Sequence, residues 1–343
     1  MTATAIARGL QAGWTHRGAL ARLLWPVSQL YRAAWALRGA GYRFGLFKSE
    51  RLPVPVIVVG NVIAGGAGKT PTVIALVQHL QARGLVVGVV SRGYGRQPAR
   101  GDDDAGLAVE PGSDPRVVGD EPLLIRRRTG APVFVGRRRA QAARRLLTLH
   151  PAVQVLVFDD GLQHLALARD IEVCVFDDRG IGNGWLLPAG PLREPWPRPA
   201  DLVLHTGQAP AFEGGYRGER RLADAAVGAD GRVVPLQSLA EQQVLLSAVA
   251  GIARPQAFFD MLRARGLVLA ETHALADHAD FSSGLPRIDA TLPLLCTEKD
   301  AAKLWQSRPD ALAVPLLFTL PADFTDYLDR LVDARLSSAS RAS

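Results

Sequence analysis

GNVIAGGAGKTP, residues 60–71, is the stretch of sequence that decides the fold. The apolar, β-branched run Val54–Val59 precedes it and predicts a buried strand. A helical pattern, Pro71–Arg83, follows it, and a proline in the first helical turn costs no hydrogen bond. A glycine-rich turn between a strand and a helix, ending in Gly-Lys-Thr, is typical of a phosphate-binding P-loop. Ile63 occupies the first glycine position of the regular pattern, so a glycine-rich turn without a ligand is the alternative.

The chemistry of such a loop follows from its backbone. Amide N–H groups of the turn and of the helix N-terminus hold phosphate oxygens. Lys69 would add a positive charge for the β- and γ-phosphates, and the Thr70 hydroxyl can ligate Mg²⁺. The sequence therefore predicts a site for a nucleoside triphosphate and Mg²⁺ at the end of this first strand.

Beyond the loop, strand and helix patterns alternate, which predicts an α/β fold with a mostly parallel sheet flanked by helices. A loop rich in Gly, Asp, Pro and Arg is expected at 96–118. Residues 207–235 show little periodicity, and strands and helices resume after them, which suggests a second, smaller α/β domain. The expected segments are a basic amphipathic one, 1–48, the P-loop core, 49–206, and the smaller domain, 207–343, part of which can return to the core. Further core strands are expected at Val86–Ser91, Pro132–Val135, Val153–Asp159, Ile171–Asp177 and Leu202–His205.

The N-terminal segment carries the excess positive charge of the chain. Residues 1–49 hold seven of the 40 lysines and arginines and none of the 33 acidic residues, so the rest of the chain is neutral. Apolar residues at helical spacing predict an amphipathic helix that starts or kinks at Pro26. A helix on an anionic membrane surface and a helix packed on the protein body fit this pattern equally well. The apolar positions are Leu20, Leu23, Leu24, Val27, Leu30, Tyr31, Ala34 and Leu37.

The composition excludes several classes of protein. With 48% hydrophobic and 21% charged residues, the chain is neither disordered nor fibrous. No uncharged apolar run reaches the ~18 residues of a membrane span. Cys174 and Cys296 lie in apolar runs and are expected to be buried thiols, which fits a reducing, cytoplasmic compartment. A nucleic-acid partner is not expected, because the chain beyond residue 49 is neutral and carries no nucleic-acid-binding motif.

Two strands are expected to end on paired carboxylates. VQVLVFDDGLQH, residues 153–164, contains Asp159 and Asp160 at the position from which a carboxylate holds Mg²⁺ beside a P-loop. A solvated Asp-Gly turn is the alternative. IEVCVFDD ends in the same form on Asp177 and Asp178, but Gln-His does not follow, and this pair is the weaker candidate.

Other residues could take part in phosphoryl transfer. GDEP contains Asp120 and Glu121, and a carboxylate near a γ-phosphate could accept the proton of a hydroxyl, although a surface turn also explains the tetrapeptide. Arg92 in SRGYGR suits a phosphate or a substrate anion. His164 and His278 have acidic neighbours in the sequence and could relay protons, whereas ordinary packing is the alternative for each.

The motifs GNVIAGGAGKTP, SRGYGR, GDEP, FDDGLQH, ADHADF and TEKDAAK, in this order, resemble those of the tetraacyldisaccharide 4′-kinase (lipid A 4′-kinase) family of the P-loop superfamily. The resemblance implies an ATP- and Mg²⁺-dependent phosphotransferase. It would transfer the γ-phosphate to the 4′-hydroxyl of tetraacyldisaccharide 1-phosphate, a glycolipid, late in lipid A biosynthesis. It also implies a peripheral enzyme on the cytoplasmic face of the bacterial inner membrane, with the N-terminal helix at the membrane surface.

The resemblance further implies roles for individual residues. Asp120 would be the catalytic base, His278 its partner, and Lys69 the third catalytic residue. The implied nucleotide loop comprises Ile63, Ala64, Gly65, Gly66, Ala67, Gly68, Lys69 and Thr70. The implied metal ligands are Thr70, Asp159, Asp160 and Glu121, and the implied substrate contacts are Arg92, Gln163 and His164.

One other enzyme class shares the loop. Regulatory P-loop ATPases that position cargo also carry an Ala-Gly-Gly-x-Gly-Lys-Thr stretch, which residues 64–70 match. Such an ATPase hydrolyses ATP without a lipid acceptor. Turnover that is independent of an acceptor would therefore favour the ATPase, whereas transfer to a lipid would favour the kinase.

Overall fold

The computed structural model describes residues 13–93, 96, 106–277, 279, 281 and 288–339. Its larger sheet contains β1 (Val56–Gly60), β2 (Val87–Ser91), β3 (Leu107–Val109), β4 (Val133–Val135), β5 (Val155–Asp159), β6 (Ile171–Phe176), β7 (Leu202–His205) and β8 (Tyr216–Arg217). The strand order is β3-β4-β2-β5-β1-β6-β7-β8. Neighbouring strands run parallel except β3 and β4. The predicted α/β fold with a mostly parallel sheet is confirmed.

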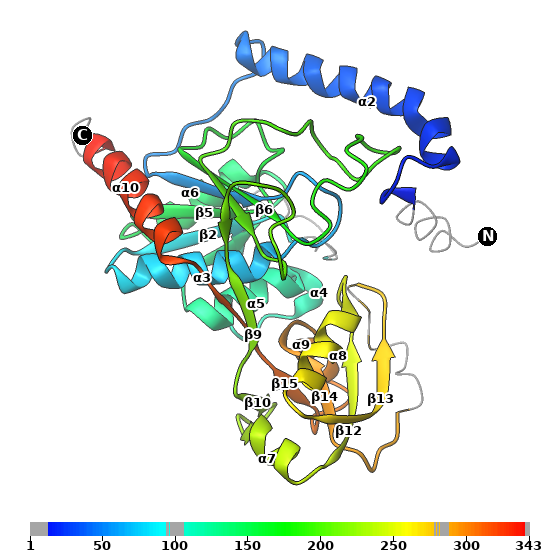
Figure 1. Cartoon of the computed structure of the whole chain (residues 1–343). Helices are drawn as coiled ribbons and strands as arrows, with labels where there is room; N and C mark the ends of the chain where they lie inside the picture. Colours follow the sequence, from blue (N-terminus) through cyan, green and yellow to red (C-terminus); the bar gives the residue numbers. More distant parts are fainter. Residues whose placement is uncertain are drawn as a thin grey trace.

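Helices cover both faces of this sheet, which is why its central strands are apolar throughout. Successive side chains of a strand point to opposite faces. On β1, Ile57 and Val59 pack with helices α3 (Lys69–Ala82), α5 (Asp120–Thr129) and α10 (Ala322–Ala339). Val56 and Val58 pack on the other face, with α6 (Arg139–Leu149) and the chain that follows β5. The C-terminal helix therefore completes the core of the first sheet, beside α3 (Figure 1).

A second sheet lies beside the first and has its own core. Its strands are β10 (Ala225–Gly228), β11 (Val233–Pro235), β12 (Leu245–Ala250), β13 (Val268–Ala274), β14 (Leu294–Thr297) and β15 (Leu312–Val314). They follow the order β11-β10-β15-β14-β12-β13. Helices α7 (Leu236–Glu241), α8 (Pro255–Ala264) and α9 (Glu298–Leu304) accompany them. An antiparallel pair, β9 (Glu219–Leu222) and β16 (Leu316–Thr319), carries the chain between the two sheets (Figure 1).

Two stretches expected to lack regular structure contain short elements. Within 96–118, β3 forms the edge of the sheet and pairs with β4, and α4 (Pro115–Val118) begins where the Asp114 side chain accepts a hydrogen bond from the Arg116 N–H. Within 207–235, four strands of two to four residues are present. Such short strands hold too few residues for hydrophobic alternation to be visible. Apart from the pair β10–β11, their partners lie elsewhere in the chain.

The N-terminal helix α2 (Ala19–Arg43) begins earlier than one that starts at Pro26. Tertiary contacts hold the helix on both sides of the proline. Ala21 is 3% exposed, and the Ser28 hydroxyl, fully buried, donates to the carbonyl oxygens of Leu186 and Leu187. These contacts offset the hydrogen bond that a proline removes from a helix. Across the described part of the chain, no helix combines the length and apolarity needed to cross a membrane.

Candidate active site

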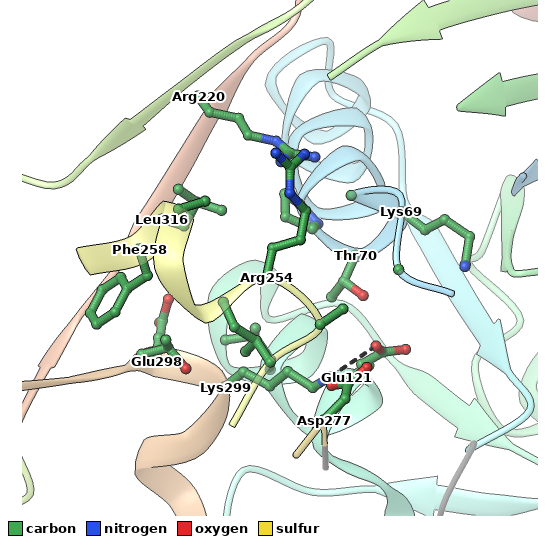
Figure 2. A pocket seen from close by; sticks show the side chains of 18 of the residues that line it. Lys69, Thr70, Glu121, Arg220, Arg254, Phe258, Asp277, Glu298, Lys299 and Leu316 are labelled. Carbon is green, nitrogen blue, oxygen red and sulfur yellow. Dashed lines mark hydrogen bonds and ion pairs between the residues drawn. The ribbon is translucent and has the colours of Figure 1, made fainter. Parts of the chain in front are cut away.

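The loop between β1 and α3 borders a pocket that the two sheets share (Figure 2). Gly65 and Gly68 have φ angles of 91° and 84°, in the left-handed region that favours glycine. Gly68 directly precedes α3, and Lys69 and Thr70 of the first helical turn line the pocket. The first N–H groups of a helix have no partner within the helix. This strand–turn–helix unit can therefore hold an anion through its backbone.

The Lys69 ammonium lies between two oxygen acceptors. Its Nζ donates to Asn61 Oδ1 at 3.1 Å and lies 3.5 Å from Asp160 Oδ1. Arg193 approaches the same carboxylate, with Nη1 3.0 Å from Asp160 Oδ1. Asn61 and Arg193 were not identified from the sequence. For Asn61, its position between the strand and the glycine-rich turn was the one sequence signal of a role. The sequence around Arg193 contains no such signal.

Asp159 is a buried carboxylate at the C-terminal end of β5, beside Val59 of β1. Ser91 Oγ donates to its Oδ2 at 3.2 Å, but its Oδ1 has no hydrogen-bond partner among the described residues. Burial, together with the negative charges of Glu121 and Asp160, raises the pKa of Asp159 to about 7, against the lowering effect of Lys69 and of the hydrogen bond from Ser91. A buried carboxylate oxygen without a donor suits a cation.

Asp160, the next residue, has the opposite environment. Burial would raise the pKa of its carboxyl group, but the positive charges of Lys69, Arg193 and Arg139 outweigh burial and lower the pKa. Its backbone carbonyl also accepts a hydrogen bond from Arg139 Nη1 at 2.7 Å. Asp160 is therefore ionised, and its nearest partners are cationic side chains that it holds beside the loop.

The donor set fits a hard cation that takes most of its ligands from elsewhere. The described residues hold no group of three or more His, Cys, Asp or Glu side chains ready to bind a metal. Mg²⁺ typically binds one or two carboxylates together with waters and phosphate oxygens. The unpartnered oxygen of Asp159 and the Thr70 hydroxyl are oxygen donors of this kind.

The two carboxylates of GDEP form ion pairs with two lysines of α9, a helix that accompanies the second sheet. Asp120 is buried at the start of α5, and its Oδ2 lies 2.7 Å from Lys303 Nζ on α9. Glu121 Oε1 lies 3.3 Å from Lys299 Nζ, which also contacts Asp277 Oδ1 at 3.1 Å (Figure 2). Both lysines belong to the TEKDAAK stretch, which carried part of the family resemblance but to which no site role was assigned.

The remainder of the pocket is apolar on one side and cationic on another. Arg220 and Arg254 lie side by side near the loop (Figure 2). Arg220 Nε is buried without a hydrogen-bond partner among the described residues. The apolar wall comes from both sheets and their helices and comprises Ile74, Leu124, Ile252, Phe258, Met261, Val314 and Leu316. Such a pocket suits a ligand that combines a flat apolar group with a polyanion.

The other residues that the sequence predicted for the site differ in their contacts and exposure. Gln163 Nε2 donates to Glu194 Oε1 at 2.7 Å and to the Asn61 carbonyl at 3.1 Å, so it holds the neighbouring chain. Burial lowers the pKa of His164 to about 4, aided by nearby arginines, so its imidazole is neutral at pH 7. Arg92 lies exposed just beyond β2. His278 lies outside the described residues.

Comparisons with known proteins place the chain among kinases. The family model for tetraacyldisaccharide-1-P 4′-kinase matches residues 20–336. The tetraacyldisaccharide 4′-kinases of Acidovorax sp. (strain JS42) and Polaromonas naphthalenivorans (strain CJ2) are 60% and 59% identical to the chain. These matches cover 98% and 96% of this chain, and 96% of each relative.

A solved structure gives the same result. The crystal structure of LpxK from Aquifex aeolicus in complex with ATP matches with a TM-score of 0.75 and 31% sequence identity. The match covers 91% of this chain and 99% of that one. Sequence and fold agree over nearly the whole length, and the chain belongs to the tetraacyldisaccharide-1-P 4′-kinase family.

Proposed function

We propose that the chain transfers the γ-phosphate of ATP to the 4′-hydroxyl of tetraacyldisaccharide 1-phosphate, a late step of lipid A biosynthesis. The observation that carries the proposal is the pocket lined by Lys69 and Thr70 of the nucleotide loop and by Glu121 of α5, in a chain that is 60% identical to a named 4′-kinase. The ATP-bound LpxK structure supports ATP as the phosphate donor.

The first part of the mechanism is positioning of the nucleotide. Residues Ile63–Thr70 would hold the phosphates through their N–H groups, and the apolar wall with Phe258 and Leu316 would receive the base. Lys69 would place its charge on the β- and γ-phosphates. Phosphoryl transfer depends mainly on position and on stabilisation of charge, so these contacts supply most of the catalysis.

The second part is the path of the proton. The 4′-oxygen attacks the γ-phosphorus, the bond from this phosphorus to the β–γ bridging oxygen breaks, and ADP leaves. Asp120 would accept the hydroxyl proton, with His278 as its partner. The ammonium of Lys303 supports this role, because it lies 2.7 Å from Asp120 Oδ2 and keeps that carboxylate oriented.

Mg²⁺ would supply charge neutralisation between the β- and γ-phosphates when bound. Asp159 and Thr70 would hold the ion, with Glu121 and Asp160 in support. The main argument for this assignment is the buried Asp159 oxygen, which has no hydrogen-bond donor in the part of the chain that the structure describes. Asp160 has Lys69 and Arg193 as partners, and its share in binding the ion would accordingly be smaller.

The acceptor would reach the pocket from the side of the first sheet where Arg92, Gln163 and His164 lie. His164 is neutral at pH 7 and could donate or accept a hydrogen bond from a sugar hydroxyl. The two sheets would belong to two domains that divide after β8, which pairs with β7 of the first sheet, rather than near residue 207, with α10 returned to the first. Their closure around ATP and acceptor would exclude water.

The test is transfer of labelled γ-phosphate from ATP to tetraacyldisaccharide 1-phosphate in detergent, with Lys69→Ala and Asp120→Ala beside the unaltered chain. We expect labelled lipid from the unaltered chain and a loss of about a thousandfold in each variant. Arg51→Gln, at an exposed Arg51–Asp170 pair away from the pocket, is the control and should behave as the unaltered chain. Label released only as inorganic phosphate, at a rate indifferent to lipid, would instead support the ATPase alternative.

We further propose that α2 holds the enzyme on the cytoplasmic face of the inner membrane. A helix on a soluble protein normally turns its apolar stripe inwards. In α2 the stripe faces outwards, and Leu23, Leu30 and Leu37 are 75%, 72% and 73% exposed. The opposite side, with Ala21 and Ser28, packs on the protein. An exposed apolar stripe flanked by arginines suits an interfacial position at an anionic bilayer.

Co-sedimentation with anionic phospholipid vesicles tests the membrane proposal. Replacement of Leu23, Leu30 and Leu37 by Gln should release the chain from vesicles and raise KM for the lipid but not KM for ATP. The matched control replaces three exposed apolar residues away from α2, Leu149, Val233 and Leu245, by Gln. Equal sedimentation of all variants, or an equal rise of both KM values, would remove this role from α2.

A further inference from the structure

The carbonyl oxygens of the nucleotide loop are held from outside by side chains. Asn61 Nδ2 donates to the carbonyls of residues 63 and 65, at 2.8 and 3.1 Å. Arg179 Nη1 and Nη2 donate to those of residues 64 and 66, at 3.2 and 2.7 Å. Thr206 Oγ1 donates to that of residue 67 at 2.9 Å. Five consecutive carbonyls are therefore turned away from the anion site, which lets the loop present N–H groups to a phosphate.

Of these side chains, Arg179 is the one that binds both the loop and a buried carboxylate. Its Nε lies 3.0 Å from both carboxylate oxygens of Asp177, which is 2% exposed, while its two terminal nitrogens reach the loop. The planar guanidinium thus joins a buried carboxylate to two peptide carbonyls in one fork. The same guanidinium also lies against Gly65, where a Cβ would meet Nη1 at 3.2 Å.

The contact with Arg179 gives a role to Asp177, at the end of β6, which the proposed mechanism does not use. Asp177 has the form of a Mg²⁺ ligand in the sequence, yet both of its oxygens bind Arg179. The loop in turn has Ile63, buried and without a glycine's conformational freedom, at the first position of the usual pattern. A loop with fewer glycines at its start needs another means to hold its shape.

We propose that Arg179, anchored by Asp177, is a positioning residue that keeps the nucleotide loop in its anion-binding shape before ATP arrives. The proposal rests on the proposed function, in which this loop binds the phosphates of ATP. Without the guanidinium, the carbonyls of residues 64 and 66 lose their hydrogen-bond donors. ATP would then have to order the loop as it binds, and this ordering lowers the binding free energy that remains. Affinity for phosphates therefore falls, whereas the transfer step at saturating ATP is left unchanged.

Binding of ADP, measured by calorimetry without any lipid, tests the proposal. Arg179→Ala should raise the Kd for ADP by about tenfold, the loss expected from charge-assisted hydrogen bonds. Arg179→Lys should recover part of this loss, because an ammonium can donate to the loop but lacks the fork geometry. Arg51→Gln, which removes an exposed arginine from an Asp170 pair, should leave the Kd unchanged.

Kinetics in the same variants separate positioning from direct action on the transferred phosphate. We expect the KM for ATP to rise with the Kd for ADP, and kcat at saturating ATP to stay within about twofold. An unchanged Kd for ADP in Arg179→Ala overturns the proposal. So does a collapse of kcat with ADP affinity intact, which would place Arg179 on the γ-phosphate. An unaltered chain that binds no ADP would instead refute the proposed function.

Discussion

The strands on either side of β1, β5 and β6, both lead into a pair of aspartates, but the two pairs have different hydrogen-bond partners. β5 ends on Asp159 and continues to Asp160, whereas β6 leads into Asp177 and Asp178. Asp159 and Asp177 are equally buried, at 2% exposed. Among the described residues, one oxygen of Asp159 has no donor, while Asp177 binds a guanidinium with both of its oxygens.

The difference teaches that the partner, not the carboxylate pair, decides the role. Arg179 lies two residues after Asp177 and folds back on it. No cation follows Asp159 at that spacing, and the cations near it approach Asp160 instead. The end of β5 therefore offers a carboxylate oxygen to a metal ion. The end of β6 instead supports the backbone of the nucleotide loop through Arg179.

Among changes at the two strand ends, the largest effect is expected from Asp159→Asn. The amide has the size of the carboxylate but lacks its charge, so a metal ion at this point loses a ligand. Transfer at saturating ATP should fall on the order of a hundredfold or more. The measurement is kcat with labelled ATP over a range of Mg²⁺ concentrations. A variant with near-normal kcat at ordinary Mg²⁺ would remove Asp159 from the metal site.

The same substitution at the other strand end should act on a different constant. Asp177→Asn loosens Arg179, and we expect KM for ATP to rise by about three- to tenfold while kcat changes by less than about threefold. Steady-state kinetics on the two asparagine variants side by side make the comparison. If both variants lose kcat alike, the two carboxylate pairs do the same work and the distinction drawn between them is wrong.

Asp178 gives a smaller effect that depends on pH. Partial burial would raise the pKa of its carboxyl group, but hydrogen bonds from Arg254 and the Gln208 N–H outweigh burial and lower it. A lowered folded-state pKa means that the pair adds stability above the unfolded value of 3.8, and that this contribution is lost as pH falls through the folded value. Arg254 lies 2.7 Å away at the start of α8, so the pair links the two sheets.

Thermal unfolding of Asp178→Asn tests this pair. Because the pair is partly exposed, the variant should melt about 1 °C lower between pH 5 and pH 7. The difference should shrink as the pH falls below 3.8 and vanish once the pH is below the lowered pKa of Asp178. Asp310→Asn, at an exposed Arg308–Asp310 pair within the second sheet's own unit, serves as the control for loss of a surface charge. A deficit that persists unchanged at low pH would mean that the ion pair is not its cause.

The smallest effect concerns Cys174, which lies on β6 three residues before Asp177. Burial raises the pKa of its thiol, and the side chain is fully buried. We expect no reaction with a maleimide in the native protein, and the same result in Asp177→Asn if the change there stays local. Labelling followed by mass spectrometry checks this. Rapid labelling in the variant alone would show that β6 itself has loosened.

Local patterns predicted much of the candidate site. Lys69 and Asp159 follow buried strands, and the carboxyl ends of neighbouring parallel strands meet at one edge of a sheet. Arg193, Lys299 and Lys303 were missed, because each contacts a residue far from it in the sequence. Lys303, for example, meets a carboxylate 183 positions away. Asn61 was missed although it contacts Lys69 within its own motif, because only the folded loop brings the two side chains together.

The sequence by itself determined the α/β fold, the parallel order around the glycine-rich turn and the amphipathic N-terminal helix. These features follow from hydrophobic periodicity and turn residues, which act over a few positions. Only the tertiary structure decided which of two identical Asp-Asp strand ends keeps a free oxygen, and that the leucine stripe of α2 faces outwards. Both outcomes depend on which groups pack against a residue in space, and short-range patterns carry no record of that.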